Sequence, residues 1–260
     1  MRETKLIHLR GKPVADGALP LICTPLVGRD RAAVRAEVEA VVPKRPELIE
    51  WRVDFFAAIG DVQEVIATAR EIAAAAQGIP VLFTRRSTDE GGEPIAISEA
   101  QVVALYEAVC AAGCVDMVDY ECAKPAEDFA RVRTAAKAAG IVLVASFHNF
   151  KATPDKAALL DRFTRAQQLG GDVAKVAVMP TGPDDVLTLL AATSAAREAL
   201  DIPLVSMSMG PWGSLSRMVG WVYGSTVTFA VGKSSSAPGQ VPIEELRAVL
   251  ATTRRTVLGR

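Results

Sequence analysis

Residues 173–179 read Val-Ala-Lys-Val-Ala-Val-Met, an apolar run that contains a single charged side chain, Lys175. Hydrophobic residues flank the lysine at both odd and even positions, which is typical of a parallel strand covered on both faces. A lysine is almost never fully buried without a partner or a task, so we expect its amine to be paired, uncharged, or both. An uncharged lysine amine is a nucleophile toward ketones and aldehydes. The alternative is a lysine near a strand end whose amine extends to water.

Seven similar runs accompany this segment along the chain, and Ala-rich amphipathic stretches separate them. The eight predicted strands are Leu19–Leu26, Glu47–Phe55, Pro80–Arg86, Val115–Cys122, Ile141–Phe150, Asp172–Met179, Ile202–Met207 and Ser225–Val231. The predicted helices lie near residues 29–42, 60–76, 97–112, 125–139, 154–169, 183–199, 214–222 and 242–257. Eight β-then-α units in roughly 250 residues predict an α/β fold, a (β/α)8 TIM barrel, as one domain over residues 1–260. An open, doubly wound sheet is the alternative, but no GxGxxG motif follows the first predicted strand.

Short signals predict how these elements begin, end and close. Leu6–Leu9 and Pro13–Val14 flank the pair Arg10-Gly11, which predicts a small N-terminal β-hairpin that closes the barrel floor. Polar residues that precede helical stretches predict N-caps, namely Ser98, Thr153 and Thr181. Glycines that follow helical stretches predict left-handed caps, namely Gly78, Gly113, Gly140 and Gly170.

The composition excludes several classes of protein. The formal net charge is −1 and there is no basic stripe, so we expect no nucleic-acid partner. No run approaches the ~18 apolar residues of a membrane span. Residues 1–5 include an acidic residue and have no long apolar stretch behind them, which argues against a signal peptide. The four cysteines include no CxxC pair and there are two histidines, so we expect no metal site. Buried free thiols and a cytoplasmic location are the better interpretation.

The active site of such a barrel lies at the carboxyl ends of the strands. The polar residues expected at that end are Glu50, Arg52, Asp54, Arg86, Asp119, Glu121, His148, Lys175 and Arg217, with the loop Gly232–Gln240 beside them. Each has a plainer explanation taken singly: Arg52 could form a structural ion pair with Asp54 or Glu50, and His148 could be a satisfied core histidine. Independent causes would scatter such residues over both barrel ends, so their convergence at one end favours a functional site.

In this order the motifs resemble those of the type I 3-dehydroquinate dehydratase family, over about residues 19 to 255. The resemblance rests on Glu50-Trp51-Arg52-Val53-Asp54, Arg86 with Glu90-Gly91-Gly92, Asp119-Tyr120-Glu121, Ser146-Phe147-His148-Asn149-Phe150, Lys175 to Pro180, Met207-Ser208-Met209-Gly210, Ser216-Arg217 and Ser236-Ala237-Pro238-Gly239-Gln240. Any one motif is weak, but all of them in this order are highly specific. The family belongs to the shikimate pathway, and its members convert the small molecule 3-dehydroquinate to 3-dehydroshikimate through a lysine imine.

The resemblance implies a role for each residue. Lys175 would form the Schiff base, His148 would act as general acid and base, and Glu90 would orient His148. Arg217, Ser236 and Gln240 would hold the substrate carboxylate and a nearby hydroxyl. Glu50, Arg52 and Arg86 would contact ring hydroxyls, and Met207 and Phe229 would pack against the ring. The resemblance further implies a cytoplasmic homodimer that needs neither a metal nor an organic cofactor, and syn elimination of water.

The chemistry requires Lys175 to attack as the free amine. We expect burial and nearby cations such as Arg52 and Arg86 to favour that uncharged form. A class I aldolase shares the barrel and the imine lysine, and would bind a phosphate in the loops after strands seven and eight. A catalytically silent barrel that binds a ligand for regulation is the other alternative, although both Lys175 and His148 are present here.

Overall fold

The computed structural model describes residues 4–14 and 19–259, and in this part of the chain eight parallel strands form one sheet in the order β10-β3-β4-β5-β6-β7-β8-β9. The strands are β3 (Leu21–Leu26), β4 (Leu48–Arg52), β5 (Val81–Thr84), β6 (Met117–Glu121), β7 (Val142–Asn149), β8 (Val173–Val178), β9 (Leu204–Ser208) and β10 (Val227–Phe229). A parallel bridge from Leu204 to Ser225 and a hydrogen bond from Thr226 N to Leu204 O, 2.7 Å long, join β9 to the start of β10. The predicted (β/α)8 barrel is therefore confirmed.

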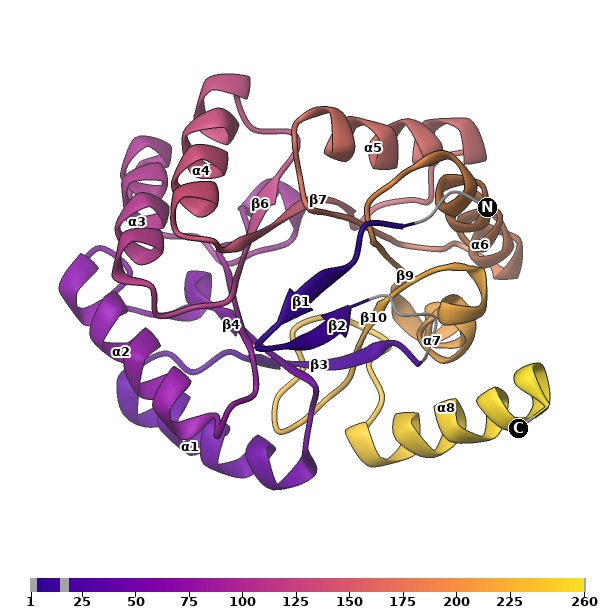
Figure 1. Ribbon diagram of the computed structural model, residues 1–260, viewed down its shortest axis with the longest axis horizontal. Coiled ribbons are helices and arrows are strands. Elements are labelled where there is room, and N and C mark those ends of the chain that lie inside the picture. Colours follow the sequence, from indigo (N-terminus) through magenta and orange to yellow (C-terminus); the bar gives the residue numbers. More distant parts are fainter. Residues whose placement is uncertain (1–3, 15–18, 260) are drawn as a thin grey trace.

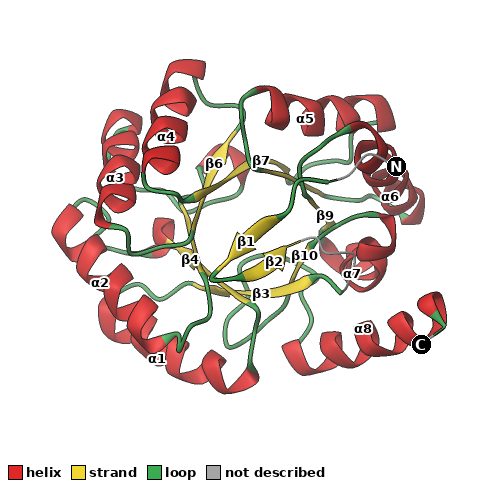
Figure 2. Cartoon of the chain, viewed as in Figure 1, coloured by secondary structure: helices red, strands yellow, loops and turns green. Residues whose placement is uncertain are grey.

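The helices surround the strands on the outside (Figures 1 and 2). They are α1 (Arg31–Val41), α2 (Val62–Ala75), α3 (Glu99–Ala112), α4 (Ala126–Ala138), α5 (Lys156–Gln168), α6 (Pro183–Ala199), α7 (Gly210–Val219) and α8 (Ile243–Leu258). Helix α7 begins four residues before the predicted start, because Pro211 stands at a first-turn position, where its missing N–H is tolerated. Within the described ranges, no helix combines the length and the apolar character that crossing a bilayer would require.

Of the three predicted N-caps, one is right and two are wrong, while the four glycines predicted as left-handed caps all have positive φ. The Ser98 side chain accepts a hydrogen bond from Gln101 N at the start of α3, in a capping box. The cap of α5 is Asp155 rather than Thr153, because a carboxylate one residue past Pro154 reaches the free N–H of Ala158 at 2.8 Å. Helix α6 starts after Gly182, while the hydroxyl of Thr181 bonds the Asp185 carboxylate at 2.8 Å.

The N-terminal hairpin closes the barrel floor, as predicted. Strands β1 (Ile7–Leu9) and β2 (Lys12–Val14) pair antiparallel, and the turn between them places Gly11 at φ +79°. Its buried side chains, Ile7, Leu9 and Val14, pack in one cluster with the inner apolar residues of the strands: Leu48, Leu82, Met117, Val144, Val173, Val205 and Val227. The Arg10 guanidinium donates to both oxygens of Asp116, at 2.8 and 3.0 Å, and ties the hairpin to the start of β6.

Each strand separates two environments, because successive side chains point to opposite faces. Outward side chains join the shell of helices, and one chain of edge-to-face rings runs through this shell: Trp51, Phe83, Tyr106, Tyr120 and Phe129. The ring centroids lie 5.2–5.8 Å apart, a favourable geometry for aromatic pairs. Inward side chains are apolar near the floor and charged near the carboxyl ends, so the fold delivers the polar residues to one end.

Phe83 is fully buried in the middle of this chain of rings. We expect Phe83→Ala to lower the free energy of unfolding by about 3–5 kcal/mol, because the change leaves a cavity and removes two ring contacts. Urea titration measures the loss. Leu187→Ala on α6, where the side chain is 62 % exposed, is the matched control and should change stability by less than about 0.5 kcal/mol. Equal effects of the two substitutions would contradict the prediction.

Candidate active site

Lys175 lies on the inner face of β8, beside Ser146 of β7 in the sheet register, and only 5 % of it is exposed. Its Nζ lies 2.8 Å from Asp119 Oδ2 and 3.6 Å from Glu50 Oε1. The ring of Phe229 covers it, with the centroid 4.9 Å from Nζ. The amine is therefore paired, and it does not extend to water. Its nearest charged partners are carboxylates, and the two arginines expected near it, Arg52 and Arg86, border the same cavity.

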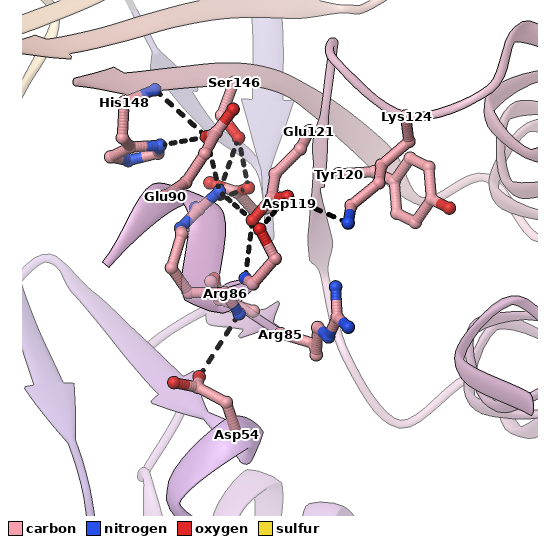
Figure 3. A network of polar contacts seen from close by, with 12 residues as sticks. Asp54, Arg85, Arg86, Glu90, Asp119, Tyr120, Glu121, Lys124, Ser146 and His148 are labelled. Carbon is pink, nitrogen blue, oxygen red and sulfur yellow. Dashed lines mark hydrogen bonds and ion pairs between the residues drawn. The ribbon is translucent and has the colours of Figure 1, made fainter. Parts of the chain in front are cut away.

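Arg86 is the centre of a buried network of charges (Figure 3). Its Nη2 donates to Asp119 Oδ1 at 2.7 Å, and its Nη1 donates to Ser146 Oγ at 2.9 Å and to Glu121 Oε1 at 3.1 Å. Glu90 Oε2 lies 3.5 Å from the same Nη1. Burial opposes the charge of Arg86, but Asp119 and Glu121 outweigh it and raise the pKa of the guanidinium above its ordinary value.

Asp119 joins the two cations of the inner face. One oxygen pairs with Lys175 and the other with Arg86, and Ser146 Oγ adds a third hydrogen bond at 2.6 Å. Burial alone would raise the pKa of the carboxyl, but the charges of Arg86 and Lys175 lower it well below its ordinary value. Asp119 is therefore ionised at neutral pH, and it holds a fixed negative charge next to the lysine nitrogen.

Glu90 and His148 form a hydrogen-bonded acid–base pair. Glu90 stands at the end of the short helix η3 (Thr88–Glu90), and its Oε2 lies 2.8 Å from His148 Nδ1 and 3.0 Å from His148 N. Burial raises the pKa of Glu90 to about 8 although the Arg86 charge opposes it. Burial, Arg86 and Lys175 lower the pKa of His148 well below its ordinary value. The two groups share protons along one hydrogen bond, so they titrate as a unit and not as two independent residues.

The ion pair of Arg52 with Asp54 is the plainer explanation that the sequence left open, and the structure contains it. Asp54 lies on the 3-10 helix η2 (Val53–Phe55) that follows β4. Its two oxygens accept from Arg52 Nε at 2.8 Å and from Nη2 at 2.7 Å. The guanidinium also stacks over Phe55 at 5.0 Å. Arg52 also borders the cavity described below, so its guanidinium pairs with Asp54 and at the same time faces the cavity.

Arg217 differs from the other buried cations because it has no carboxylate partner within the described ranges of the chain. It lies on α7 and is 2 % exposed. Its Nη1 contacts Met207 Sδ at 3.5 Å, and its Nη2 donates to Pro238 O at 3.2 Å, while Nε has no partner. Burial lowers the pKa of Arg217 to about 10, so the group stays charged at neutral pH. An unpaired buried guanidinium is suited to an anionic ligand.

The loop of residues 232–240 lies against the start of α7. Gly210 N donates to Pro238 O at 3.1 Å, and a Cβ added to Gly239 would meet Gly210 O at 2.1 Å, so only glycine fits there. Within the loop, the amide of Gln240 bonds Ser236 Oγ at 3.3 Å and accepts from Ser235 Oγ at 3.1 Å. The loop thus presents hydroxyl and amide groups at the carboxyl end of the barrel.

These side chains enclose a cavity of about 420 Å³, counted with its open mouth. Its lining residues are Glu50, Arg52, Arg86, Glu90, His148, Phe150, Lys175, Ala177, Met207, Met209, Phe229, Ser236, Ala237 and Gln240. Ten of the eleven site residues predicted from the sequence are in this set, and Arg217 lies behind it against Met207 and Pro238. No group of three or more metal-binding side chains is found in residues 4–14 and 19–259.

The sequence argument overlooked some residues that shape the site. Thr84 donates to Glu50 Oε1 at 3.0 Å, and Ser146 bonds both Asp119 and Arg86. Ser146 lies two residues before His148 on β7, and Thr84, the last residue of β5, lies two residues before Arg86, so the alternation of inward positions could have found them. The other apolar lining residues, apart from Met207 and Phe229, carried no such signal, because an inward alanine or phenylalanine in the sequence is indistinguishable from ordinary core.

A family profile described as type I 3-dehydroquinase matches residues 22–256 of the chain. The 3-dehydroquinate dehydratase of Albidiferax ferrireducens is 57% identical over 257 residues, which cover 99% of this chain and 97% of that protein. The one of Aromatoleum aromaticum is 51% identical over 259 residues, the full length of both. The crystal structure of 3-dehydroquinate dehydratase from Geobacillus kaustophilus superposes with a TM-score of 0.94 at 48% identity, over 97% of each chain.

The pairing of one carboxylate with two buried cations generates a stability prediction. We expect Asp119→Asn to lower the free energy of unfolding at pH 7 by about 3–5 kcal/mol, because it leaves both cations undercompensated. The folded-state pKa of Asp119 is depressed, so its contribution is complete above about pH 4–5 and is lost as the pH falls below that range. Urea titrations of both proteins should therefore show a stability difference that narrows toward acidic pH. A difference that is constant from pH 7 to the acidic limit would contradict this assignment.

Proposed function

The chain belongs to the type I 3-dehydroquinase family, and we propose that it dehydrates 3-dehydroquinate to 3-dehydroshikimate through an imine formed by Lys175. One observation carries the mechanism: the amine of Lys175 lines the cavity although it is 95 % buried, next to a fixed carboxylate and on the neighbouring strand to His148. A lysine in that position suits covalent chemistry with a carbonyl group.

The first step is the formation of the imine. Lys175 gives up a proton to His148, and its free amine adds to the ketone carbon. The carbinolamine then takes a proton from His148 on its hydroxyl and loses water to give an iminium ion. That ion carries its positive charge on the nitrogen that pairs with Asp119 at 2.8 Å in the resting protein. Because the carboxylate is already in place and ionised, it stabilises the iminium without any reorganisation. Asp119 therefore pairs with the nitrogen of Lys175 both before and after the imine forms.

The second step is the elimination of water. The iminium acts as an electron sink, so the neighbouring C–H bond becomes acidic and His148 can remove the proton through Nε2. The electron pair forms an enamine, which expels the β-hydroxyl group as the protonated His148 returns the proton to it on the same face. This is a syn elimination, and water then hydrolyses the conjugated iminium to release the enone product and free Lys175.

The remaining residues hold the substrate. The charge of Arg217 has no carboxylate partner among the described residues, and it would bind the substrate carboxylate together with Ser236 and Gln240 from the loop. Glu50, Arg52 and Arg86 border the cavity near Lys175 and would contact the ring hydroxyls, while Met207 and Phe229 would pack against the ring. A substrate carboxylate next to Arg217 would supply the charged partner that this guanidinium lacks, so binding of the substrate would also neutralise the buried charge.

A relative supports covalent chemistry in this family. The type I 3-dehydroquinate dehydratase from Clostridium difficile, 34% identical with a TM-score of 0.93, was solved with covalently modified comenic acid. By contrast, 3-hexulose-6-phosphate synthase is 16% identical with a TM-score of 0.59, which shows a shared fold alone. A shared fold alone gives no support to the aldolase alternative.

The protein's location and assembly are proposals as well. All four cysteines are free thiols, which suits the cytoplasm, where glutathione keeps thiols reduced. A homodimer follows from the family resemblance, and we propose a small molecule, and no nucleic acid or membrane, as the partner of the site.

Borohydride reduction in the presence of 3-dehydroquinate should trap the imine on Lys175. We expect a stable mass gain on the peptide that contains Lys175 and loss of activity after reduction. Lys175→Met should show neither the adduct nor the rise in ultraviolet absorbance of the enone. Mass mapping of a tryptic digest locates the adduct. An adduct on another lysine, or product formation by Lys175→Met at the wild-type rate, would refute the mechanism, and release of two fragments would indicate an aldolase.

Arg217→Met tests the carboxylate site. The substitution keeps a long apolar stem but removes the charge, so we expect KM to rise about 100-fold or more, the equivalent of a lost charged hydrogen bond. Steady-state rates measured by enone absorbance give KM and kcat separately. Arg247→Met is the control, since that guanidinium bonds the carbonyls of Lys44 and Arg45 outside the cavity, and its KM should be unchanged. An unaltered KM for Arg217→Met would contradict the role.

A further inference from the structure

Glu121, the last residue of β6, is buried and does not border the cavity, yet its carboxylate is fully engaged. Oε1 accepts from Ser87 N at 2.7 Å and from Arg86 Nη1 at 3.1 Å. Oε2 accepts from Ser87 Oγ at 2.6 Å, and Lys124 Nζ lies 3.7 Å from it on the outer side. The backbone N–H and the hydroxyl of Ser87 therefore both donate to one carboxylate, that of Glu121.

Ser87 is the residue at which the turn that carries Glu90 begins. It caps η3, and its carbonyl accepts from Glu90 N at 3.1 Å and from Gly92 N at 2.8 Å. The turn folds back so closely that a Cβ on Gly92 would meet Arg86 O at 2.0 Å. Glu121 thus fixes the first residue of the turn, and the bond from Glu90 to His148 fixes its last.

Starting from the proposed function, we propose that Glu121 is a positioning residue for the reaction, which acts through Ser87 and Arg86 to set where Glu90 meets His148. Its carboxylate touches neither the cavity nor His148, so it acts on the chemistry only through these two residues and through its charge.

The charge of Glu121 also reaches the acid–base pair. The groups that act on Glu90 besides burial are Arg86 on the same segment, Asp119 and Glu121 on β6, and His148 on β7. After burial and the opposing Arg86, Glu121 is the largest of these influences, and it raises the pKa of Glu90. Removal of its charge should therefore lower the pKa of the pair, so that His148 becomes available as a base at lower pH.

A purely structural role would have a different signature. If Glu121 only stabilised the fold, its replacement would lower the unfolding temperature and scale the rate down equally at every pH. A positioning role lowers kcat with little change in KM and also moves the acidic limb of the pH profile of kcat/KM. The shift in pH is the readout that separates these two roles.

The test is Glu121→Gln in the full chain, with rates of enone formation from 3-dehydroquinate measured against pH. We expect kcat to fall about 10- to 100-fold, in line with a small displacement of a catalytic group, KM to change little, and the acidic limb to move to lower pH. Glu99→Gln is the matched control. Glu99 is the first residue of α3, and its carboxylate pairs with Lys124 at 3.3 Å and with Arg85 at 3.0 Å but does not contact Ser87. It should behave as the wild type.

Ser87→Ala removes the hydroxyl bond and keeps the charge, so it should lower kcat by less and leave the acidic limb in place. Wild-type kcat in both Glu121→Gln and Ser87→Ala would overturn the inference, as would a uniform loss in Glu121→Gln that tracks its melting temperature without a shift of the limb. If Glu121→Gln does not fold, an unchanged kcat in Ser87→Ala overturns it. A wild-type protein that forms no enone from 3-dehydroquinate would instead refute the proposed function.

Discussion

The rest of the site depends on the carboxylate of Asp119, which neutralises two buried cations at once. A single charge placed in a dry barrel would be too costly, but a carboxylate shared between Arg86 and Lys175 offsets both desolvation penalties with two short ion pairs, at 2.7 and 2.8 Å. This balance has consequences for protonation. Asp119 remains ionised, while burial, together with the charges of Arg86 and Lys175, lowers the pKa of His148 and keeps its imidazole neutral, which is the form a base requires.

Two of the buried arginines near the cavity illustrate two uses of a buried guanidinium. Arg86 is surrounded by carboxylates and a serine hydroxyl, so both of its Nη atoms form hydrogen bonds within the protein. Arg217 is equally buried but has only a sulfur and a carbonyl oxygen beside it. The protein therefore satisfies one cation itself and leaves the other for a ligand. The contrast is visible only in three dimensions, because the sequence does not show which arginine will have carboxylates beside it.

The sequence predicted the barrel, the hairpin and most of the cavity lining, because period-two strands and glycine-ended helices repeat often enough to be counted. It also located the lysine, since a charge inside an apolar run is costly wherever it lies. It did not predict which charges would pair. Arg52 and Arg86 do share the cavity with Lys175, but the sequence did not show that Asp119, from a strand 56 residues away, supplies the nearest charge. The cap at Thr153 was misplaced because Asp155 caps α5 instead, and the cap at Thr181 because α6 starts after Gly182 without a side-chain cap.

The alternation within the strands also bears on which genetic changes the protein can tolerate. In β4 the residue between Glu50 and Arg52 is Trp51, so charged side chains line the interior while the indole packs among the helices. Deletion or insertion of one codon inside such a strand would exchange the inward and outward side chains. An indole would then lie in the cavity, and carboxylates would lie in the apolar layer between strands and helices. Changes of chain length should therefore accumulate in the connections between strands and helices, and the strand lengths should be the least variable feature of the gene.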